Sequence, residues 1–244
     1  MSELSVQLYS VRDKYAADPT GTLQRLAAIG FTRVEPYGVV QNADFLRAGL
    51  PANGLTAPTA HAQLIGADQH AVFAAAVECG IGVVIDPFVP ADKWQEEADI
   101  SATAGAINSA AKIAAEHGVT VGYHNHWWEL QSRIGGRSAL EVFADQLDPS
   151  VVLEVDTYWA TAGGEDAPAL LGRLGERVHA IHVKDGGLAT DASGQLPAGQ
   201  GQVPVAEVLA AAPNALRVVE FDAYDGDIFE GDAASYAYLT GAER

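Results

Sequence analysis

The chain of 244 residues carries 32 acidic and 14 basic residues, which gives a formal net charge of −18. Binding to nucleic acid requires clustered Lys and Arg that neutralise phosphates, so this balance argues against DNA or RNA as a partner. The single cysteine, Cys79, excludes an internal disulfide and suits a reducing compartment. The N-terminal segment "MSELSVQLYSVRDKY" lacks an apolar stretch behind a basic start, and no run approaches the ~20 apolar residues of a membrane helix. We therefore expect a cytoplasmic protein without a secretion signal or membrane contact.

Eight short apolar runs, rich in β-branched and aromatic residues, recur along the chain and are typical of buried strands. They cover residues 4–10, 32–38, 55–62, 82–88, 120–126, 151–159, 179–185 and 217–222. Ala- and Leu-rich segments with helical spacing lie between them, at residues 20–30, 69–80, 101–118, 138–147, 167–178 and 205–213. Several of these segments end on Gly, as the left-handed C-cap of a helix prefers.

This alternation predicts an α/β fold, a single (β/α)8 TIM barrel domain over residues 1–244. A doubly wound open sheet shares the alternation, but a count of eight strands and a length near ~250 residues favour closure. The segment "YSVRDKYAADPTG" after the first run lacks the glycine fingerprint of dinucleotide-binding folds. The longest irregular segment, residues 186–204, follows the seventh run. We expect it to lie over the carboxyl end of the barrel, where barrels keep their chemistry.

Polar side chains occur where the predicted strands end, and parallel strands bring their carboxyl ends together. Three of them, Asp156, His182 and Glu220, come from consecutive runs and should be neighbours in space. Carboxylate and imidazole donors bind Mn²⁺, Zn²⁺, Co²⁺ or, less well, Mg²⁺. An ion-pair network at the rim of the barrel is the alternative. The other polar residues at strand ends are Tyr9, Glu35, His61, Asp86, His124, His126, Lys184 and Asp222.

The chain resembles the xylose-isomerase-like TIM-barrel superfamily, and most closely its sugar phosphate isomerase/epimerase branch. Six motifs in the family's order carry this resemblance over nearly the whole chain: "QLYSVRD", "VEPYG", "YHNHWWEL", "LEVDTYWA", "HVKD" and "VVEFD". The resemblance implies a divalent metal, Mn²⁺ first, held by residues of the fifth to eighth strands. Asp156, His182 and Glu220 match the last three ligands. His124 stands where many relatives carry an acidic ligand, so its ligation is a hypothesis.

A further branch of the same superfamily, the AP endonucleases, builds a three-zinc site. It needs a histidine three residues after the aspartate of the sixth strand, and Trp159 stands there in this chain. His61 could mimic one more of the zinc ligands, but the set is incomplete. Together with the acidity of the chain, this departure argues against DNA repair.

The resemblance also implies catalysis by proton abstraction beside a metal-bound carbonyl, with Glu220 and His126 as candidate bases. Lys184 is a further catalytic candidate, as an acid or electrophile, although an internal pair with Glu154 or a Schiff base is an alternative. Packing or rim hydrogen bonds are the alternative roles for the residues that we expect to contact substrate, which are Tyr9, Glu35, His61, Trp128 and Trp159.

We expect a metal-dependent isomerase or epimerase for a small keto-sugar or polyol. The missing acidic residue at His124 means that the two-carboxylate proton shuttle of ketose epimerases does not carry over intact. A dehydratase or lyase for a keto-inositol or a 3-keto-glycoside is therefore the first alternative. A sugar-binding barrel without activity is the second. A homo-oligomer stays open, because exposed helices often pair such barrels.

Overall fold

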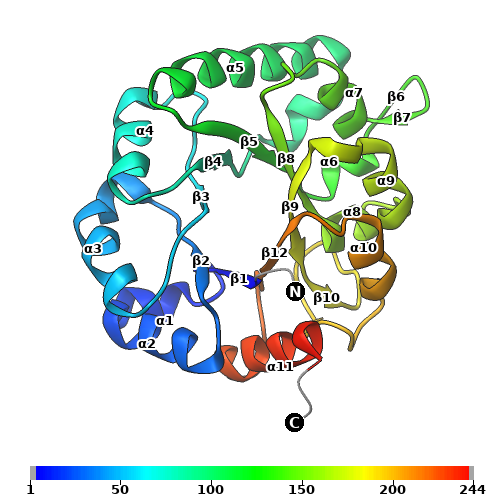
Figure 1. Cartoon of the computed structure of the whole chain (residues 1–244). Coiled ribbons are helices and arrows are strands. Elements are labelled where there is room, and N and C mark those ends of the chain that lie inside the picture. Colours follow the sequence, from blue (N-terminus) through cyan, green and yellow to red (C-terminus); the bar gives the residue numbers. More distant parts are fainter. Residues whose placement is uncertain (1–3, 242–244) are drawn as a thin grey trace.

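The computed structural model describes residues 4–241. Eight parallel strands form one sheet in the order β2-β1-β12-β9-β8-β5-β4-β3, and Figure 1 shows them inside a ring of helices. The two end strands approach each other through isolated bridges that join Arg33 to Thr56 and Tyr37 to His61. The barrel is therefore nearly closed, which confirms the predicted (β/α)8 fold.

Each predicted strand run overlaps one barrel strand, although the strands themselves are only three to six residues long. Two small antiparallel hairpins lie outside the barrel and pair β6 (Arg133–Ile134) with β7 (Arg137–Ser138) and β10 (Asp185–Gly186) with β11 (Gln195–Leu196). The barrel strands are β1 (Leu4–Gln7), β2 (Arg33–Glu35), β3 (Thr59–His61), β4 (Val83–Asp86), β5 (Thr120–His124), β8 (Val152–Asp156), β9 (Val178–Val183) and β12 (Leu216–Val219).

All six predicted helical segments are helical in the structure. They correspond to α2 (Pro19–Ile29), α4 (Gln69–Glu78), α5 (Glu97–Glu116), α7 (Ala139–Asp145), α9 (Ala167–Leu174) and α10 (Val205–Ala211). The structure adds helices that the sequence pattern did not predict: α1 (Arg12–Ala17), α3 (Val39–Ala52), α6 (Trp128–Gln131), α8 (Thr157–Ala162) and α11 (Ile228–Thr240). Short 3-10 turns, η1 (Ala91–Trp94) and η2 (Gly175–Arg177), complete the set.

The sixth predicted strand is the clearest difference in boundary. The apolar run predicted a strand as far as Trp159, but β8 ends at Asp156 and α8 begins at the next residue. Asp156 is the N-cap of α8, because its Oδ1 accepts the backbone N–H of Trp159 at 2.8 Å. The cap keeps Asp156 at the carboxyl end of the barrel.

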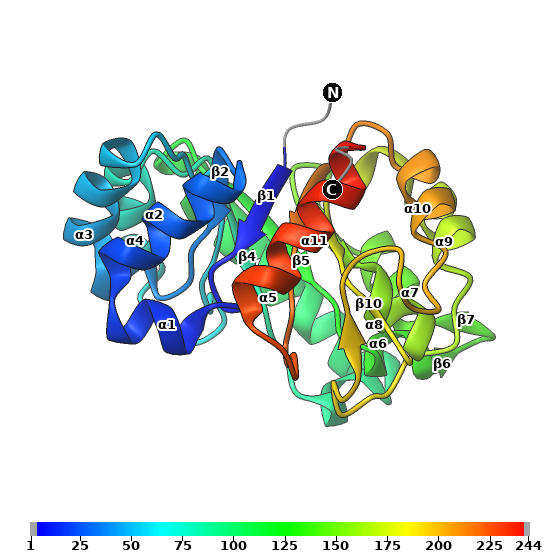
Figure 2. The same ribbon diagram turned by 90° about the horizontal axis from the view of Figure 1, so that it is seen from below.

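The two ends of the barrel differ in what they carry. Figure 2 shows the start of β1 and the end of α11 near one end, whereas α1, α6 and α8 lie at the opposite end. That opposite end holds the carboxyl ends of the strands and is called the mouth below. None of the described helices combines the length and apolar character that a bilayer span requires.

The inside of the barrel becomes polar toward the mouth. Alternate residues of a strand share a face, so pairs such as Glu154 and Asp156 both point inward. The register places Asp156 beside His182 and His124 beside Glu154. All four side chains are buried. The strand period therefore creates two polar layers, one at the mouth and one directly beneath it.

Helix α11 carries a buried carboxyl group without a partner. Asp232 is 0% exposed, and neither of its oxygens has a hydrogen bond partner in the described part of the chain. Burial, and then the charge of Asp227, raises its pKa from 3.8 to about 8. Because the folded pKa exceeds the unfolded one, the fold favours the protonated acid. Stability is therefore lost as the pH rises from about 4 through about 8.

We predict that Asp232→Asn stabilises the protein by about 1–3 kcal/mol at pH 8, because it removes the buried ionisation. The gain should shrink toward zero near pH 4, where the wild-type carboxyl is protonated. Urea unfolding at several pH values measures the difference, with the exposed Asp225→Asn as control. A gain that does not vary with pH would contradict the assignment.

Candidate active site

Four predicted ligand residues converge at the mouth. His124 and Asp156 end their strands β5 and β8, His182 lies in β9, and Glu220 follows β12. One donor atom from each lies within 4.8 Å of the donor atoms of the others, and all four residues are buried. This cluster could hold a metal ion. Metal binding by these residues stays a prediction.

His182 uses both ring nitrogens. Its Nδ1 lies 2.6 Å from Glu220 Oε2, and its Nε2 lies 2.8 Å from Glu35 Oε1 and 3.0 Å from Glu154 Oε2. Burial alone would lower the pKa of His182, but the charges of Glu154 and Glu220 outweigh it and hold this pKa well above the usual value. Without a cation, the ring is therefore an imidazolium that donates from both nitrogens.

His124 is held in one tautomer by the carboxylate beneath it. Its Nδ1 lies 3.2 Å from Glu154 Oε2, and its Nε2 lies 3.9 Å from Asp156 Oδ2. Burial keeps the pKa of His124 well below its usual value, so the ring is neutral. A single proton on Nδ1 donates to Glu154 and leaves the Nε2 lone pair toward Asp156. This is the form in which an imidazole binds a metal.

Glu154 was not among the predicted site residues, yet one of its carboxylate oxygens contacts three imidazole rings. Oε2 lies 2.6 Å from His61 Nε2 and also contacts His124 and His182. Burial raises the pKa of Glu154, but the charges of His182 and His61 and the imidazole hydrogen bonds outweigh it, so the net pKa is well below the usual value. Burial, followed by the charge of Glu154, raises the pKa of Glu35. Of the two buried glutamates Glu35 and Glu154, Glu154 is therefore the ionised one.

Lys184 forms ion pairs with carboxylates of the polar layer at the mouth and not with Glu154. Its Nζ lies 2.8 Å from Asp156 Oδ2, 2.5 Å from Glu220 Oε2 and 2.7 Å from Asp222 Oδ2. Burial would lower the pKa of Lys184, but these carboxylates raise it well above the usual value. A Schiff base requires the neutral amine, so the three carboxylates work against that alternative.

His126 is a second neutral imidazole at the pocket. Its ring stacks on Trp128 with the centroids 4.3 Å apart and the planes at 5°, and its backbone N–H donates to Glu129 Oε2 at 2.9 Å. Burial, and then the charge of Lys184, lowers its pKa to about 4. Its Nδ1 has no hydrogen bond partner among residues 4–241. The ring is therefore unprotonated at neutral pH.

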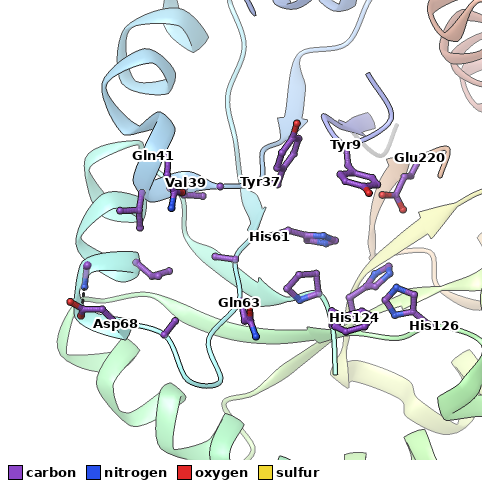
Figure 3. A pocket seen from close by; sticks show the side chains of 18 of the residues that line it. Tyr9, Tyr37, Val39, Gln41, His61, Gln63, Asp68, His124, His126 and Glu220 are labelled. Atoms are coloured by element: carbon purple, nitrogen blue, oxygen red, sulfur yellow. Dashed lines mark hydrogen bonds between the residues drawn. The ribbon is translucent and has the colours of Figure 1, made fainter. Parts of the chain in front are cut away.

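A pocket of about 780 Å³ opens at the mouth (Figure 3). Five of the predicted site residues line it: Tyr9, His61, His124, His126 and Glu220. The others lie behind this lining. Glu35 is buried and accepts Gln7 Nε2 at 2.8 Å, Trp128 supports His126, and Trp159 packs 5.4 Å from Lys184 Nζ. Substrate contact by any of these residues stays a prediction.

Two further residues of the site received no functional role from the sequence. Glu154 was considered only as a partner of Lys184, and Asp222 was noted only at the end of its strand. The strand period of two nevertheless places them on the same face as Asp156 and Glu220. Tyr37, Val40 and Phe88 also line the pocket. Tyr37 and Phe88 fall in predicted strand runs but lie just beyond the ends of β2 and β4, and Val40 comes from α3, which the sequence pattern did not predict.

Hydrogen bonds to the side chain of Asp185 hold the irregular segment 186–204, which follows β9, in place. Asp185 accepts the backbone N–H groups of Gly199, Gly201 and Val203 at 2.9–3.0 Å, and that of Gly186 at 2.8 Å. A Cβ on Gly201 would lie 2.2 Å from the Gly186 nitrogen, so only Gly fits. The fastened segment carries Gln195, whose Nε2 donates to Asp222 Oδ2 at 2.9 Å.

The chain matches a family model described as a xylose isomerase-like TIM barrel over residues 23–215. The protein therefore belongs to the xylose isomerase-like TIM barrel family. No curated protein matches the chain.

Solved structures share the fold at low sequence identity. A sugar phosphate isomerase/epimerase from Parabacteroides distasonis has a TM-score of 0.85 at 22% identity, over 99% of this chain and 94% of that one. The probable 3-DHS dehydratase AsbF from Bacillus anthracis has a TM-score of 0.78 at 15% identity, over 99% and 100% of the two chains. The IOLI protein with a bound zinc atom has a TM-score of 0.71 at 13% identity, over 99% and 96%.

We predict that Asp185→Ala loosens the segment 186–204 and lowers the free energy of unfolding by about 1–3 kcal/mol, because four backbone N–H groups lose their acceptor and the hydrogen bonds of Gly186 and Val203 are buried. Chemical denaturation measures the loss, and limited proteolysis should show new cleavage within this segment. The exposed Asp191→Ala in the same segment is the control. Equal stability and equal cleavage in the two variants would contradict the fastening role.

Proposed function

We propose that the protein is a divalent-metal-dependent isomerase or epimerase acting on a keto-sugar or polyol derivative. The observation that carries the proposal is the convergence of four donor groups from neighbouring strands beside a pocket. Membership of the xylose isomerase-like family supports it. So do the names of two neighbours of the same fold, a sugar phosphate isomerase/epimerase and a protein with bound zinc.

The donor set fits a divalent cation. The helix cap occupies Asp156 Oδ1 and leaves Oδ2 for other contacts, while His124 offers a lone pair. Two imidazoles and two carboxylates suit Mn²⁺, Zn²⁺ or Co²⁺ better than Mg²⁺, and Mn²⁺ is our first choice. A cation here would replace the proton on His182 Nδ1 and share carboxylate oxygens with Lys184.

A bound cation would supply Lewis-acid polarisation of a substrate carbonyl, which acidifies the neighbouring C–H bond. We assign the base to His126, because the ring is neutral and lines the pocket. Glu220 is the second candidate base, but His182 and Lys184 already contact its Oε2. Lys184 holds its proton firmly and stabilises negative charge that develops near Asp156 and Glu220.

Elimination is the second candidate reaction, and one observation favours it. Glu220 is the single glutamate among the described residues that line the pocket, and the remaining carboxylates there are Asp68 and Asp222. A carboxylate pair on opposite faces of a sugar is therefore not available in the form that ketose epimerases use. A dehydratase or lyase needs one base, and His126 would supply it and could return the same proton to the leaving group. A neighbour of the same fold is named a probable dehydratase.

We predict proton exchange when the Mn²⁺-loaded protein is incubated in D₂O with keto-sugars and inososes. NMR should detect deuterium at the carbon next to the carbonyl, and mass spectrometry should detect loss of water or of a leaving group if elimination follows. Asp156→Asn should abolish exchange. Binding of sugars without exchange across the panel would identify an inactive sugar-binding barrel and would refute the enzyme proposal.

We predict that Glu154→Gln weakens Mn²⁺ binding about 10–100-fold, because Glu154 sets the tautomer of His124 and supports His182. Isothermal titration of the chelator-treated protein measures this affinity. The matched control is Glu97→Gln, an exposed glutamate at the start of α5. Equal affinities in the two variants would show that Glu154 does not position the ligands.

A further inference from the structure

The pocket at the mouth has two chemically different sides. Figure 3 shows His61, His124, His126 and Glu220 gathered on one side, with Val39 and Gln41 across the cavity. The far side is built from the start of α3 and from residues 62–72. Most of its side chains are apolar: Tyr37, Val39, Val40, Ala62, Ala67, Ala71 and Val72.

Apolar side chains on this pocket are unusually open. The described residues include six large hydrophobic side chains that are well exposed to solvent, and three of them line this one cavity. Tyr9 and Val40 are each 43% exposed and Phe88 is 49% exposed. Exposed apolar surface gathered in a cavity is a mark of ligand binding, whereas scattered exposure needs no explanation.

The aromatic walls are fixed before any ligand arrives. The Tyr9 ring meets Tyr37 edge to face with centroids 5.6 Å apart, and Phe88 meets Trp128 in the same way at 5.7 Å. Such preformed surfaces bind a flat apolar group without the cost of ordering side chains. The cavity volume, about 780 Å³, falls in the ~300–1,000 Å³ range of sites for drug-sized ligands. It exceeds the needs of one sugar ring.

Phosphate recognition finds little support in the same walls. Neither Lys nor Arg occurs among the described residues that line the pocket. Lys184 lies behind them and is paired with three carboxylates. Arg12 packs over the Tyr9 ring and donates to the backbone carbonyls of Tyr9 and Asp222. The first turn of α3 offers backbone N–H groups, but Asp68 and Asp222 also line the cavity.

We propose that the substrate is an uncharged sugar joined to an apolar, aromatic ring. The sugar contacts the imidazole side of the pocket, as the proposed function requires, and the aromatic ring lies against Tyr37 and Val40 on the opposite side (Figure 3). We therefore expect the pocket to prefer a sugar that carries an aromatic ring over a sugar that carries a phosphate.

The test compares phenyl and methyl 3-keto-β-D-glucopyranoside by isothermal titration into the Mn²⁺-loaded protein. We expect the phenyl compound to bind about tenfold more tightly, because its ring leaves water for an apolar wall. Val40→Asn should reduce that ratio to about threefold or less, since it places a polar group against the ring. Val77→Asn is the control, because Val77 is 50% exposed on α4 and does not line the pocket.

The ratio is also measured in Asp156→Asn, where the proposed catalysis is lost. A ratio that persists there supports the apolar site even if the enzyme proposal fails. Equal binding of the phenyl and methyl compounds would overturn the inference. Tighter binding of glucose 6-phosphate than of glucose would also overturn it. The same holds if the protein is a dimer that Val40→Asn dissociates while the ratio of phenyl to methyl binding stays unchanged.

Discussion

The arrangement of the mouth depends on His182, whose two nitrogens are both committed to carboxylates. Nδ1 contacts Glu220 at 2.6 Å, and Nε2 contacts Glu35 at 2.8 Å. A buried charge is tolerated only when it is paired, so loss of either contact leaves an uncompensated group in the barrel. The ring therefore ties the polar layer at the mouth to the polar layer beneath it. Each layer then has a separate task.

The polar layer beneath the mouth (the lower layer) orients the imidazole rings, and the polar layer at the mouth (the upper layer) offers donor atoms for a cation. Glu154 fixes the proton of His124 on Nδ1, so that the opposite nitrogen faces Asp156. In the upper layer, Asp156, Glu220 and Asp222 surround the Lys184 ammonium. The alternation of a strand produces both layers, because residues two apart point to the same side at different heights. A carboxylate under each imidazole is the arrangement that raises its basicity toward a metal.

The sequence was sufficient for the barrel and for the four residues that converge at its mouth. Strand and helix periods are local, and strand order alone brings Asp156 next to His182. The ion-pair partner of Lys184 could not be predicted from the sequence. Its spacing allows contact with Glu154 or with Asp156, and only packing decides between them. The apolar wall was beyond reach for a similar reason. Val40 lies in α3, whose residues gave no clear helical pattern and include Pro51 in the last turn.

One charge distribution governs which molecules the pocket accepts. The net charge of −18 and the carboxylates at the mouth would attract a divalent cation. The same field repels phosphate esters, and no basic side chain among the described lining residues offsets it. An anionic group on the apolar side would also lose its water without gaining a partner. A neutral molecule avoids both costs, and an aromatic ring gains from the wall that an anion must avoid. Charge and apolar surface therefore both support the proposed kind of substrate.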